Sequence, residues 1–250
     1  MTNFRLPTPS DCPNPRDMTS KRALPDKSDF SHVTEWVFDL DNTLYPHHID
    51  LFAQIDRNMT AYVAELLGLE HDEARKLQKQ YYFEHGTTLR GLMHHHGIDP
   101  HEFLEAAHRI DYSPLPADEG LSEVIKALPG RKFIFTNGTV KHAEAAARAL
   151  GILDHFEDIF DIVAADYVPK PAGATYDKFA SLHRVETRKA VMFEDLPRNL
   201  VAPKELGMKT VLLVPSVDNK PLERWEIADD GDEHIDYITT NLVDFLRAII

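Results

Sequence analysis

The sequence predicts an α/β protein with a doubly wound parallel sheet, a Rossmann-like core, into which a small all-helical cap is inserted after the first strand. Two observations predict this class. Short apolar runs at residues 36–38, 133–135 and 190–193 have the composition of strands buried on both faces of a parallel sheet. Helical patterns lie between them, and repeated alternation of strand and helix favours parallel pairing.

The chain of 250 residues is 43% hydrophobic, enough for one large domain or for a core with an inserted smaller one. We expect residues 1–30 to be a flexible leader, because five prolines stand there among polar residues without apolar periodicity. Residues 31–46 and 115–250 are expected to form the core. The cap is expected at residues 47–114.

The elements follow in order along the chain. The first strand, at residues 36–38, leads directly into Asp39. From residue 47 to residue 110 the pattern is helical; Phe52, Ile55 and Met59, for example, recur as on one helix face. A further helix is expected to begin at Pro100, with Asp99 as its cap. After a hinge at 111–116 we expect helices at 121–128, 140–150, 174–183, 199–206 and 242–249, and strands at 132–135, 162–164, 190–193, 210–214 and near 237.

Composition limits the partners. A formal net charge of −14 argues against binding of nucleic-acid polymers or anionic membranes, because both require a basic face. No apolar stretch approaches the ~20 residues that span a bilayer, the N-terminus lacks the layout of a signal peptide, and the single cysteine, Cys12, cannot form an internal disulfide. We therefore expect a cytoplasmic protein. The oligomeric state stays open.

Polar motifs follow the three predicted strands named first. They are Asp39-Leu40-Asp41, Thr136-Asn137-Gly138 and Glu194-Asp195, and a fourth motif, Pro169-Lys170-Pro171, lies between them in a loop. Ligands of open α/β sheets bind at the carboxyl ends of the strands, so we expect these motifs to meet there. Three of them have a plainer explanation when taken alone: Asp39-Leu40-Asp41 and Thr136-Asn137-Gly138 could cap helices, and Lys170 could be a solvated surface lysine.

A phosphate site is compatible with these residues. The Thr136 hydroxyl and the free amides of Asn137 and Gly138, just ahead of a helix, can bind phosphoryl oxygens. Phosphate together with carboxylates suits a hard cation that takes oxygen ligands, so the implied metal is Mg²⁺. Such a site must be locally positive against the net charge of the chain.

In their order along the chain, the four motifs resemble those of the haloacid dehalogenase-like phosphohydrolases. The resemblance implies that Asp39 is the nucleophile, forming an aspartyl-phosphate, and that Asp41 is the general acid and base. It implies that Lys170 offsets the charge of Asp39 and the phosphate. It also implies that Asp39 and Asp195 bind the metal through side chains, Asp41 through its carbonyl, and Glu194 directly or through water.

Thr43 is then expected to hold the nucleophile loop, and Asn199 to orient Lys170 or an acidic neighbour. By the same resemblance, Asp41 favours a phosphatase or phosphomutase, because dehalogenating members lack an acid at that position. An Asn42 in place of the commoner glycine, and the Thr88-Leu89-Arg90-Gly91-Leu92 segment, resemble the pyrimidine 5′-nucleotidase branch.

The function implied by this branch is hydrolysis of pyrimidine nucleoside 5′-monophosphates, with Arg90 in the cap binding part of the substrate. The alternatives are a phosphoglycolate or phosphosugar phosphatase, a sugar phosphomutase, and, from another class, a non-catalytic binding protein on the same fold. The cap favours a small phosphorylated metabolite as partner. His94-His95-His96 invites a metal hypothesis, but consecutive helical residues point about 100° apart and cannot converge on one ion. We expect these histidines to be solvated or to pack within the cap.

Overall fold

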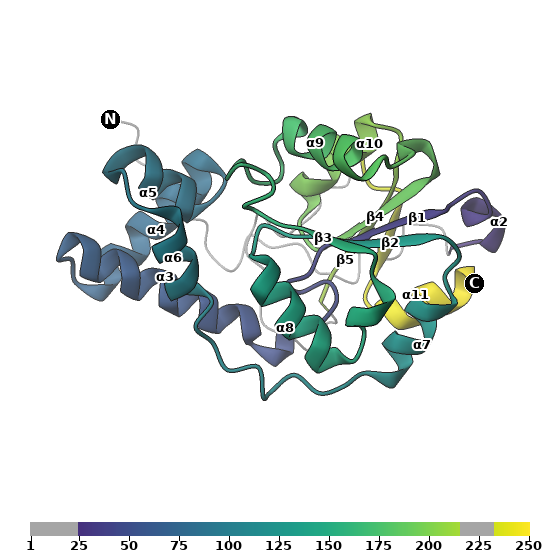
Figure 1. Cartoon of the computed structure of the whole chain (residues 1–250), viewed down its shortest axis with the longest axis horizontal. Coiled ribbons are helices and arrows are strands. Elements are labelled where there is room, and N and C mark those ends of the chain that lie inside the picture. Colours follow the sequence, from purple (N-terminus) through teal and green to yellow (C-terminus); the bar gives the residue numbers. More distant parts are fainter. Residues whose placement is uncertain (1–24, 216–232) are drawn as a thin grey trace, which may run out of the picture.

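The computed structural model describes residues 25–215 and 233–250. These residues form a six-stranded parallel sheet with helices on both faces. A separate group of helices lies beyond the carboxyl ends of the strands (Figure 1). The predicted fold class is therefore confirmed, including an insertion that contains only helices between the first two strands. Residues 1–24, most of the predicted leader, lie outside the described residues.

The sheet is built from short strands that are all parallel to their neighbours. Their spatial order is β3-β2-β1-β4-β5-β6. Every residue of the two central strands β1 and β4 is buried, which explains their uninterrupted apolar runs. The strands are β1 (Glu35–Phe38), β2 (Arg131–Phe135), β3 (Asp158–Phe160), β4 (Ala190–Glu194), β5 (Lys209–Leu213) and β6 (Tyr237–Thr239).

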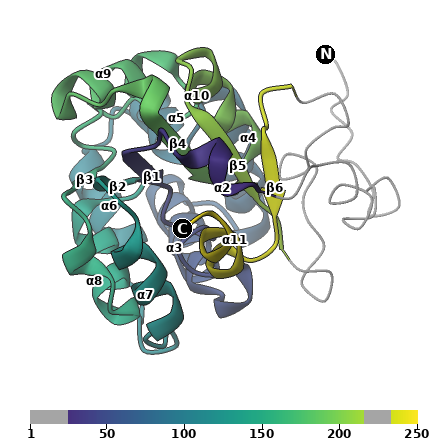
Figure 2. The ribbon, with the colours of Figure 1, turned by 90° about the vertical axis from the view of Figure 1, so that its right-hand side faces the viewer.

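Helices cover both faces of this sheet (Figure 2). Alternate strand residues point to opposite faces, so that Phe38 belongs to one hydrophobic cluster and Val37 to the other. The Phe38 face is covered by α2 (Lys27–Phe30), α7 (Glu119–Ala127), α8 (Val140–Leu150) and α11 (Leu242–Ile249). The Val37 face is covered by α9 (Gly173–His183) and α10 (Val201–Glu205). Single 3₁₀ turns lie at η2 (His47–Ile49), η3 (Leu153–His155), η4 (Thr187–Lys189) and η5 (Pro197–Leu200).

The inserted helices have a hydrophobic cluster of their own. They are α3 (Leu51–Leu67), α4 (His71–His85), α5 (Thr88–His96) and α6 (Pro100–Ala107). The helices α4 and α5 pack closely because Gly91 faces Tyr81: a Cβ at Gly91 would lie 2.4 Å from the Cβ of Tyr81. We call this group the cap. Within the described part of the chain, no helix combines the length and apolar character needed to cross a bilayer.

Several local predictions are confirmed. The helices expected at 140–150 and 242–249 have those bounds, and they begin after Thr139 and Asn241, whose side chains accept hydrogen bonds from the first turn. Asp99 caps α6 by accepting from the His101 amide at 2.8 Å. The interpretation of these segments from capping residues and apolar spacing was therefore sound.

Other predictions are wrong in detail. The strand expected at 162–164 is instead β3 (Asp158–Phe160), and Ile162 is buried because it packs against the cap. The helix expected at 199–206 is split into η5 and α10, because Pro203 has no backbone N–H to donate to the carbonyl of Asn199 four residues earlier. The predicted end of the leader, at residue 30, is also wrong. Asp26 caps the helix α2, and Phe30 is buried against Tyr237 and Phe245.

Candidate active site

The carboxyl ends of β1, β2 and β4 carry the predicted motifs. Phe38 on β1 lies opposite Ile134 on β2 and Phe193 on β4, so the chain leaves all three strands at the same edge. The Asp39 amide still donates to the Phe193 carbonyl at 2.9 Å. The sheet register therefore places the residues that follow these strands side by side.

The loop after β1 turns back sharply at Asn42, whose φ is 63°. Asparagine is one of the few non-glycine residues that tolerate this left-handed conformation. Its side-chain nitrogen donates to Asp195 Oδ2 at 3.3 Å, so it also joins the first motif to the last. Thr43 supports the loop through its backbone, which donates to Leu40, while its buried hydroxyl has no hydrogen-bond partner within the described structure.

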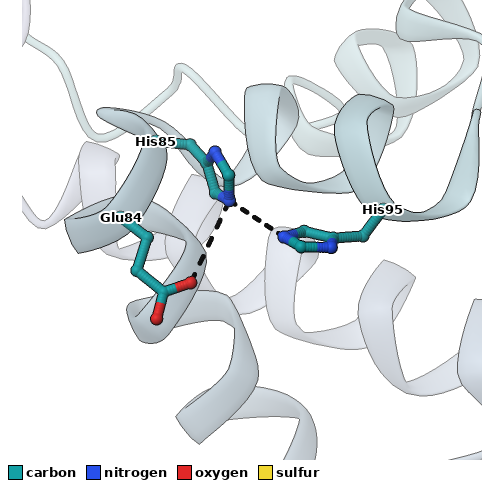
Figure 3. A group of neighbouring side chains, drawn as sticks. All are labelled: Glu84, His85 and His95. Atoms are coloured by element: carbon teal, nitrogen blue, oxygen red, sulfur yellow. Dashed lines mark hydrogen bonds and ion pairs between the residues drawn. The ribbon is translucent and has the colours of Figure 1, made fainter.

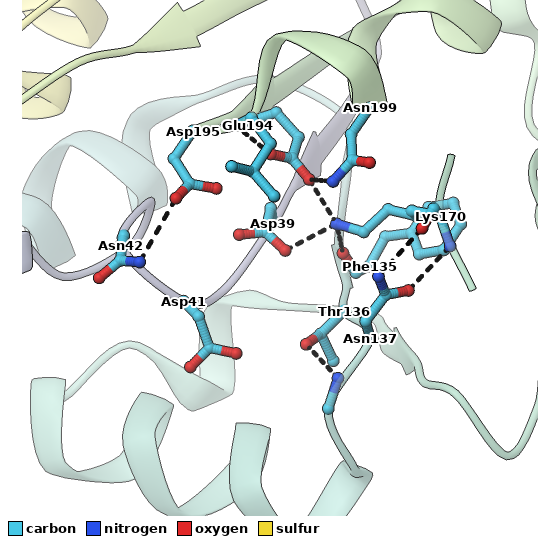
Figure 4. A network of polar contacts seen from close by, with 12 residues as sticks. Asp39, Asp41, Asn42, Phe135, Thr136, Asn137, Lys170, Glu194, Asp195 and Asn199 are labelled. Carbon is cyan, nitrogen blue, oxygen red and sulfur yellow. Dashed lines mark hydrogen bonds and ion pairs between the residues drawn. The ribbon is translucent and has the colours of Figure 1, made fainter. Parts of the chain in front are cut away.

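Lys170 is the centre of a buried ionic network (Figure 4). Its ammonium donates to Asp39 Oδ1 at 2.6 Å, to Glu194 Oε1 at 2.8 Å and to the Phe135 carbonyl at 2.9 Å. Burial lowers the pKa of this amine, but the Asp39 and Glu194 carboxylates raise it to well above its usual range. Lys170 therefore remains a cation between the two acids.

The Lys170 loop is held by Asn137. The Lys170 amide donates to Asn137 Oδ1 at 2.9 Å, and the Asn137 side chain donates to the Lys170 carbonyl at 3.3 Å. Thr136 accepts from the Gly138 amide at 2.8 Å through its hydroxyl. Asn137 and Gly138 line the cavity described below, whereas Thr136 does not. The structure thus gives Asn137 a positioning role that the motif alone did not indicate.

Glu194 is held by several donors in addition to Lys170. Asn199 donates to Glu194 Oε1 at 2.6 Å, and the Leu196 amide donates to Oε2 at 2.7 Å. Asn199 therefore orients an acidic neighbour. Burial raises the pKa of Glu194, but Lys170 and these hydrogen bonds outweigh burial and lower it. Glu194 is consequently the ionised partner of Lys170.

The acidic residues fit a divalent cation. One ligand oxygen each from Asp39, Glu194 and Asp195 lies within 4.8 Å of the others, and all three residues are buried. Burial raises the pKa of Asp39 to about 7, with contributions from the charges of Glu194 and Asp41, although Lys170 opposes this. The cluster thus has more negative charge than Lys170 neutralises. Carboxylate oxygens are the ligands that Mg²⁺ prefers in proteins, so the donor set fits this ion.

Asp41 faces a second network, which the sequence did not reveal. Its Oδ1 lies 2.8 Å from Nε2 of His142 on α8 and accepts from the Tyr45 hydroxyl. His142 Nδ1 lies 2.9 Å from the Tyr112 hydroxyl. A set of hydrogens in which Tyr112 donates to Nδ1 and Nε2 donates to Asp41 satisfies all of these groups. His108 packs against His142, with 4.8 Å between the ring centroids.

Burial and charge tune the groups around Asp41. Burial raises the pKa of Asp41, but His142 and the hydrogen bond from Tyr45 outweigh it and lower this pKa. Burial lowers the pKa of His108 to about 4, and raises that of Tyr112 to about 12. The available sequence signal was His142 itself, a histidine on the otherwise alanine-rich buried face of the helix predicted at 140–150.

A cavity of about 340 Å³ opens between the sheet edge and the cap. Asp39, Asp41 and Lys170 line its core side, and apolar residues of α3, α5 and α6 line its cap side. Arg90 does not line it: Leu89 and Gly91 are buried, and Arg90 points away from them into solvent. We therefore remove Arg90 from the site predicted from the sequence.

The fold and the site define a protein of the Rossmann-like α/β class with paired carboxylates at the end of the first strand. The sequence profile of the haloacid dehalogenase-like hydrolases matches residues 37–207, more than half of the chain. The chain therefore belongs to the haloacid dehalogenase-like hydrolase family.

The chain is also similar to individual proteins. Phosphate metabolism protein 8 of Saccharomyces cerevisiae is 30% identical over 148 residues, which cover 54% of this chain and 45% of that protein, so the match spans less than half of the relative. The structure is similar to a phosphatase of this family from Thermococcus onnurineus, with a TM-score of 0.58 and 18% identity over 87% of this chain and 97% of that one. It is also similar to L-2-haloacid dehalogenase from Xanthobacter autotrophicus, with a TM-score of 0.57 and 16% identity over 87% and 98% of the two chains. These structures share the fold.

Proposed function

We propose that the protein is a Mg²⁺-dependent phosphomonoesterase that acts through an aspartyl-phosphate on Asp39, and that its substrates are pyrimidine nucleoside 5′-monophosphates. One observation carries the proposal. Asp39 is held by Lys170, and a second acid two residues further along the same loop, Asp41, is held by His142. This pairing supplies a nucleophile and a separate proton donor on the same side of one cavity.

The residues of the chain divide the reaction as follows. An Asp39 oxygen attacks phosphorus while the bond from phosphorus to the ester oxygen breaks. Asp41, whose lowered pKa makes it a carboxylate before the substrate binds, must take up a proton as the phosphate enters, and it gives that proton to the ester oxygen. Asp41 then takes a proton from water, whose oxygen attacks phosphorus and releases phosphate from Asp39. The backbone amide of Asn137, at the cavity wall, binds a phosphoryl oxygen. Lys170 offsets the charge of two anions that must approach each other.

When bound, Mg²⁺ would supply additional positive charge for the phosphoryl oxygens. Asp39 and Asp195 would hold it through side chains, and Asp41 through its carbonyl. Glu194 already accepts from Lys170, Asn199 and the Leu196 amide, which favours a contact through water over direct binding. Orienting Asp195 would be the role of Asn42.

Asp41 supports phosphate-ester chemistry over dehalogenation. A halide is a stable anion and leaves without a proton, whereas an alkoxide leaves slowly unless an acid protonates it. The buried His142 holds Asp41 in the cavity wall, where an acid for the second case is needed. The similarity to dehalogenase structures concerns the fold, so it does not weigh against this choice.

The cap side of the cavity supports a nucleoside as the leaving group. Apolar residues there offer a surface for a flat ring; they include Phe52, Met59, Leu89, Phe103 and Leu104. Arg75, Gln78 and Lys79 stand beside them as hydrogen-bond donors, held together by Asp56 at 2.7–2.9 Å. A volume of about 340 Å³ lies near the lower end of the range of about 300–1,000 Å³ typical of small-molecule sites.

Arg198 is the residue we propose for contact with the sugar or base. It lies on η5 of the core, and its guanidinium carbon lies 4.4 Å from the ring centroid of Tyr82 on α4 of the cap. Both side chains line the cavity, so a substrate held there would meet the guanidinium and the ring.

The test is release of phosphate, with Mg²⁺, from UMP, CMP, AMP, GMP, phosphoglycolate, hexose phosphates and an aryl phosphate. Asp39→Asn serves as the blank, because the amide has nearly the same shape but is not nucleophilic. A preference for UMP and CMP is expected. Equal or sugar-biased rates would keep the phosphatase and reject the nucleotide assignment, and turnover by Asp39→Asn would reject the mechanism.

Substitution of Arg198 separates recognition from chemistry. Arg198→Ala is expected to raise KM for UMP by about 10- to 150-fold, which corresponds to the loss of about 1.5–3 kcal/mol for a hydrogen bond from a charged group. The KM for the aryl phosphate is expected to change less. Arg90→Ala is the matched control, since this arginine is exposed outside the cavity. Equal losses for both substrates in Arg198→Ala would show that Arg198 holds the fold instead of the leaving group.

A further inference from the structure

The histidine run at the end of α5 has a partner on the neighbouring helix. His94, His95 and His96 do not converge on one point, but His85 at the end of α4 lies opposite His95, with 3.0 Å between the two Nε2 atoms (Figure 3). The Glu84 carboxylate lies 4.0 Å from His85 Nε2. One ligand atom from each of these three residues lies within 4.8 Å of the others.

The distances suit a metal ion. Two imidazole nitrogens bound tetrahedrally to zinc by bonds of about 2.0–2.1 Å lie about 3.3 Å apart, only slightly farther than the two Nε2 atoms of His85 and His95. Without an ion, these nitrogens can be satisfied only if one of them carries a hydrogen. With an ion, both present lone pairs to it and Glu84 contributes a charge.

Neighbouring side chains hold the three groups in place. The Tyr81 ring stacks on His95 with a centroid distance of 5.0 Å and an angle of 11°, and its hydroxyl lies 2.7 Å from His96 Nε2. Gln80 donates to Glu84 Oε1 at 2.9 Å, so the other carboxylate oxygen faces His85. Such outer contacts fix the orientation of metal ligands in known sites.

We propose that Glu84, His85 and His95 form a binding site for one divalent transition-metal ion, such as Zn²⁺, at the junction of α4 and α5. Two imidazoles with one carboxylate select Zn²⁺, Co²⁺, Ni²⁺ or Cu²⁺ over Mg²⁺, which prefers oxygen ligands alone. The site is therefore chemically different from the acidic cluster at Asp39. Three protein ligands leave one position for water.

The junction adjoins the candidate active site. Gly86, directly after His85, lies against Pro169, the neighbour of Lys170, and Thr87 lines the cavity. An ion that joins the end of α4 to α5 stabilises this corner of the cap. Its binding is expected to raise the melting temperature of the protein, whatever the substrate of the enzyme is.

The experiment is titration of the full chain with Zn²⁺ by calorimetry, with Mg²⁺ in large excess to fill the acidic cluster. The wild type is expected to bind one Zn²⁺, with an affinity more than about 100-fold higher than that of His95→Ala or His85→Ala. Loss of a residue that only supports a ligand lowers metal affinity by up to about 100-fold, and loss of a ligand itself should cost more. His71→Ala is the matched control, because this exposed histidine begins the same helix and is not part of the group. Co²⁺ in place of Zn²⁺ should give the visible absorption of a four-coordinate site.

Equal Zn²⁺ affinity and stoichiometry in the wild type and both variants would overturn the proposal, as would loss of binding in His71→Ala. Urea unfolding in EDTA verifies that the variants are folded, and Glu84→Gln provides a third variant on an exposed residue. Phosphatase activity is not part of this test, so failure here and failure of the proposed function are distinguishable.

Discussion

Replacing Lys170 with methionine removes the positive charge that Asp39 and Glu194 share while keeping most of the apolar length of the side chain. The lysine is 1% exposed and donates to both carboxylates, at 2.6 and 2.8 Å. In the variant two buried acids remain without their cation. The free energy of unfolding in the absence of metal is therefore expected to fall substantially.

The magnitude follows from these contacts. Removal of one partner from a buried ion pair costs about 3–5 kcal/mol, because it leaves an uncompensated charge in the interior. The free energy of unfolding of a typical domain is about 5–15 kcal/mol in total. The variant is thus expected to fold, with a deficit of about 3–5 kcal/mol at pH 8.

The deficit depends on pH in a defined direction. Burial already raises the pKa of Asp39 to about 7 with Lys170 present, and loss of the lysine raises it further. A carboxyl whose folded pKa exceeds its unfolded value stabilises the fold at low pH and loses this contribution as pH rises through the folded pKa. The deficit should therefore be larger at pH 8 than at pH 6, by up to about 1.4 kcal/mol from Asp39 over the interval above pH 7.

Urea unfolding in EDTA, followed by circular dichroism at pH 6 and pH 8, measures the deficit. Lys178→Met is the matched control, because Lys178 and Asp166 form an ion pair at 2.5 Å whose side chains are 39% and 79% exposed. The control is expected to lose less than about 1 kcal/mol. A Lys170→Met deficit no larger than that of the control, or one that shrinks as pH rises, would refute the reasoning.

Three further predictions concern other parts of the site and the cap. Asp41→Asn should slow phosphate release by about 10²–10⁴-fold, and His142→Gln should slow it less. If His142 acts through Asp41, the double variant should be no slower than Asp41→Asn. Additive losses of rate in a steady-state assay would contradict this. Mg²⁺ at 100 times its dissociation constant should raise the free energy of unfolding by about 2.7 kcal/mol, and no shift of the urea midpoint on adding EDTA would argue against the metal site. Gly91→Ala should lower stability by about 1–3 kcal/mol because its Cβ would lie 2.4 Å from the Cβ of Tyr81, and an unchanged midpoint would mean that α4 and α5 can separate without cost.

Local patterns in the sequence were sufficient for most of the fold. Parallel strands that are buried on both faces contain apolar runs, and capping residues mark the first turns of helices. The strands β1 and β4 and the helices α8 and α11 could therefore be predicted. The prediction of a strand at 162–164 was wrong because an apolar sequence indicates that a residue is buried but not which element covers it. Ile162 is covered by the cap and not by neighbouring strands.

The site was predictable only where its residues lie in motifs at strand ends. Asp39, Asp41, Glu194 and Asp195 meet at the sheet edge, because parallel strands end together. Lys170 lies in a loop and was predicted from the resemblance of its motif to those of the family. Arg90 was misplaced, since a helical residue can face the cavity or solvent and its neighbours along the chain did not decide which.

The sequence by itself determined the fold class, the family and the acids and the lysine at the centre of the site, because each depends on residues close together in the chain or at the ends of recognisable strands. Only the tertiary structure decided which distant side chains meet: His142 with Asp41, Arg198 with Tyr82, and His85 with His95. Such pairs depend on the packing of one helix or loop against another. That packing is set by the whole hydrophobic core and leaves no local periodicity for the sequence to show.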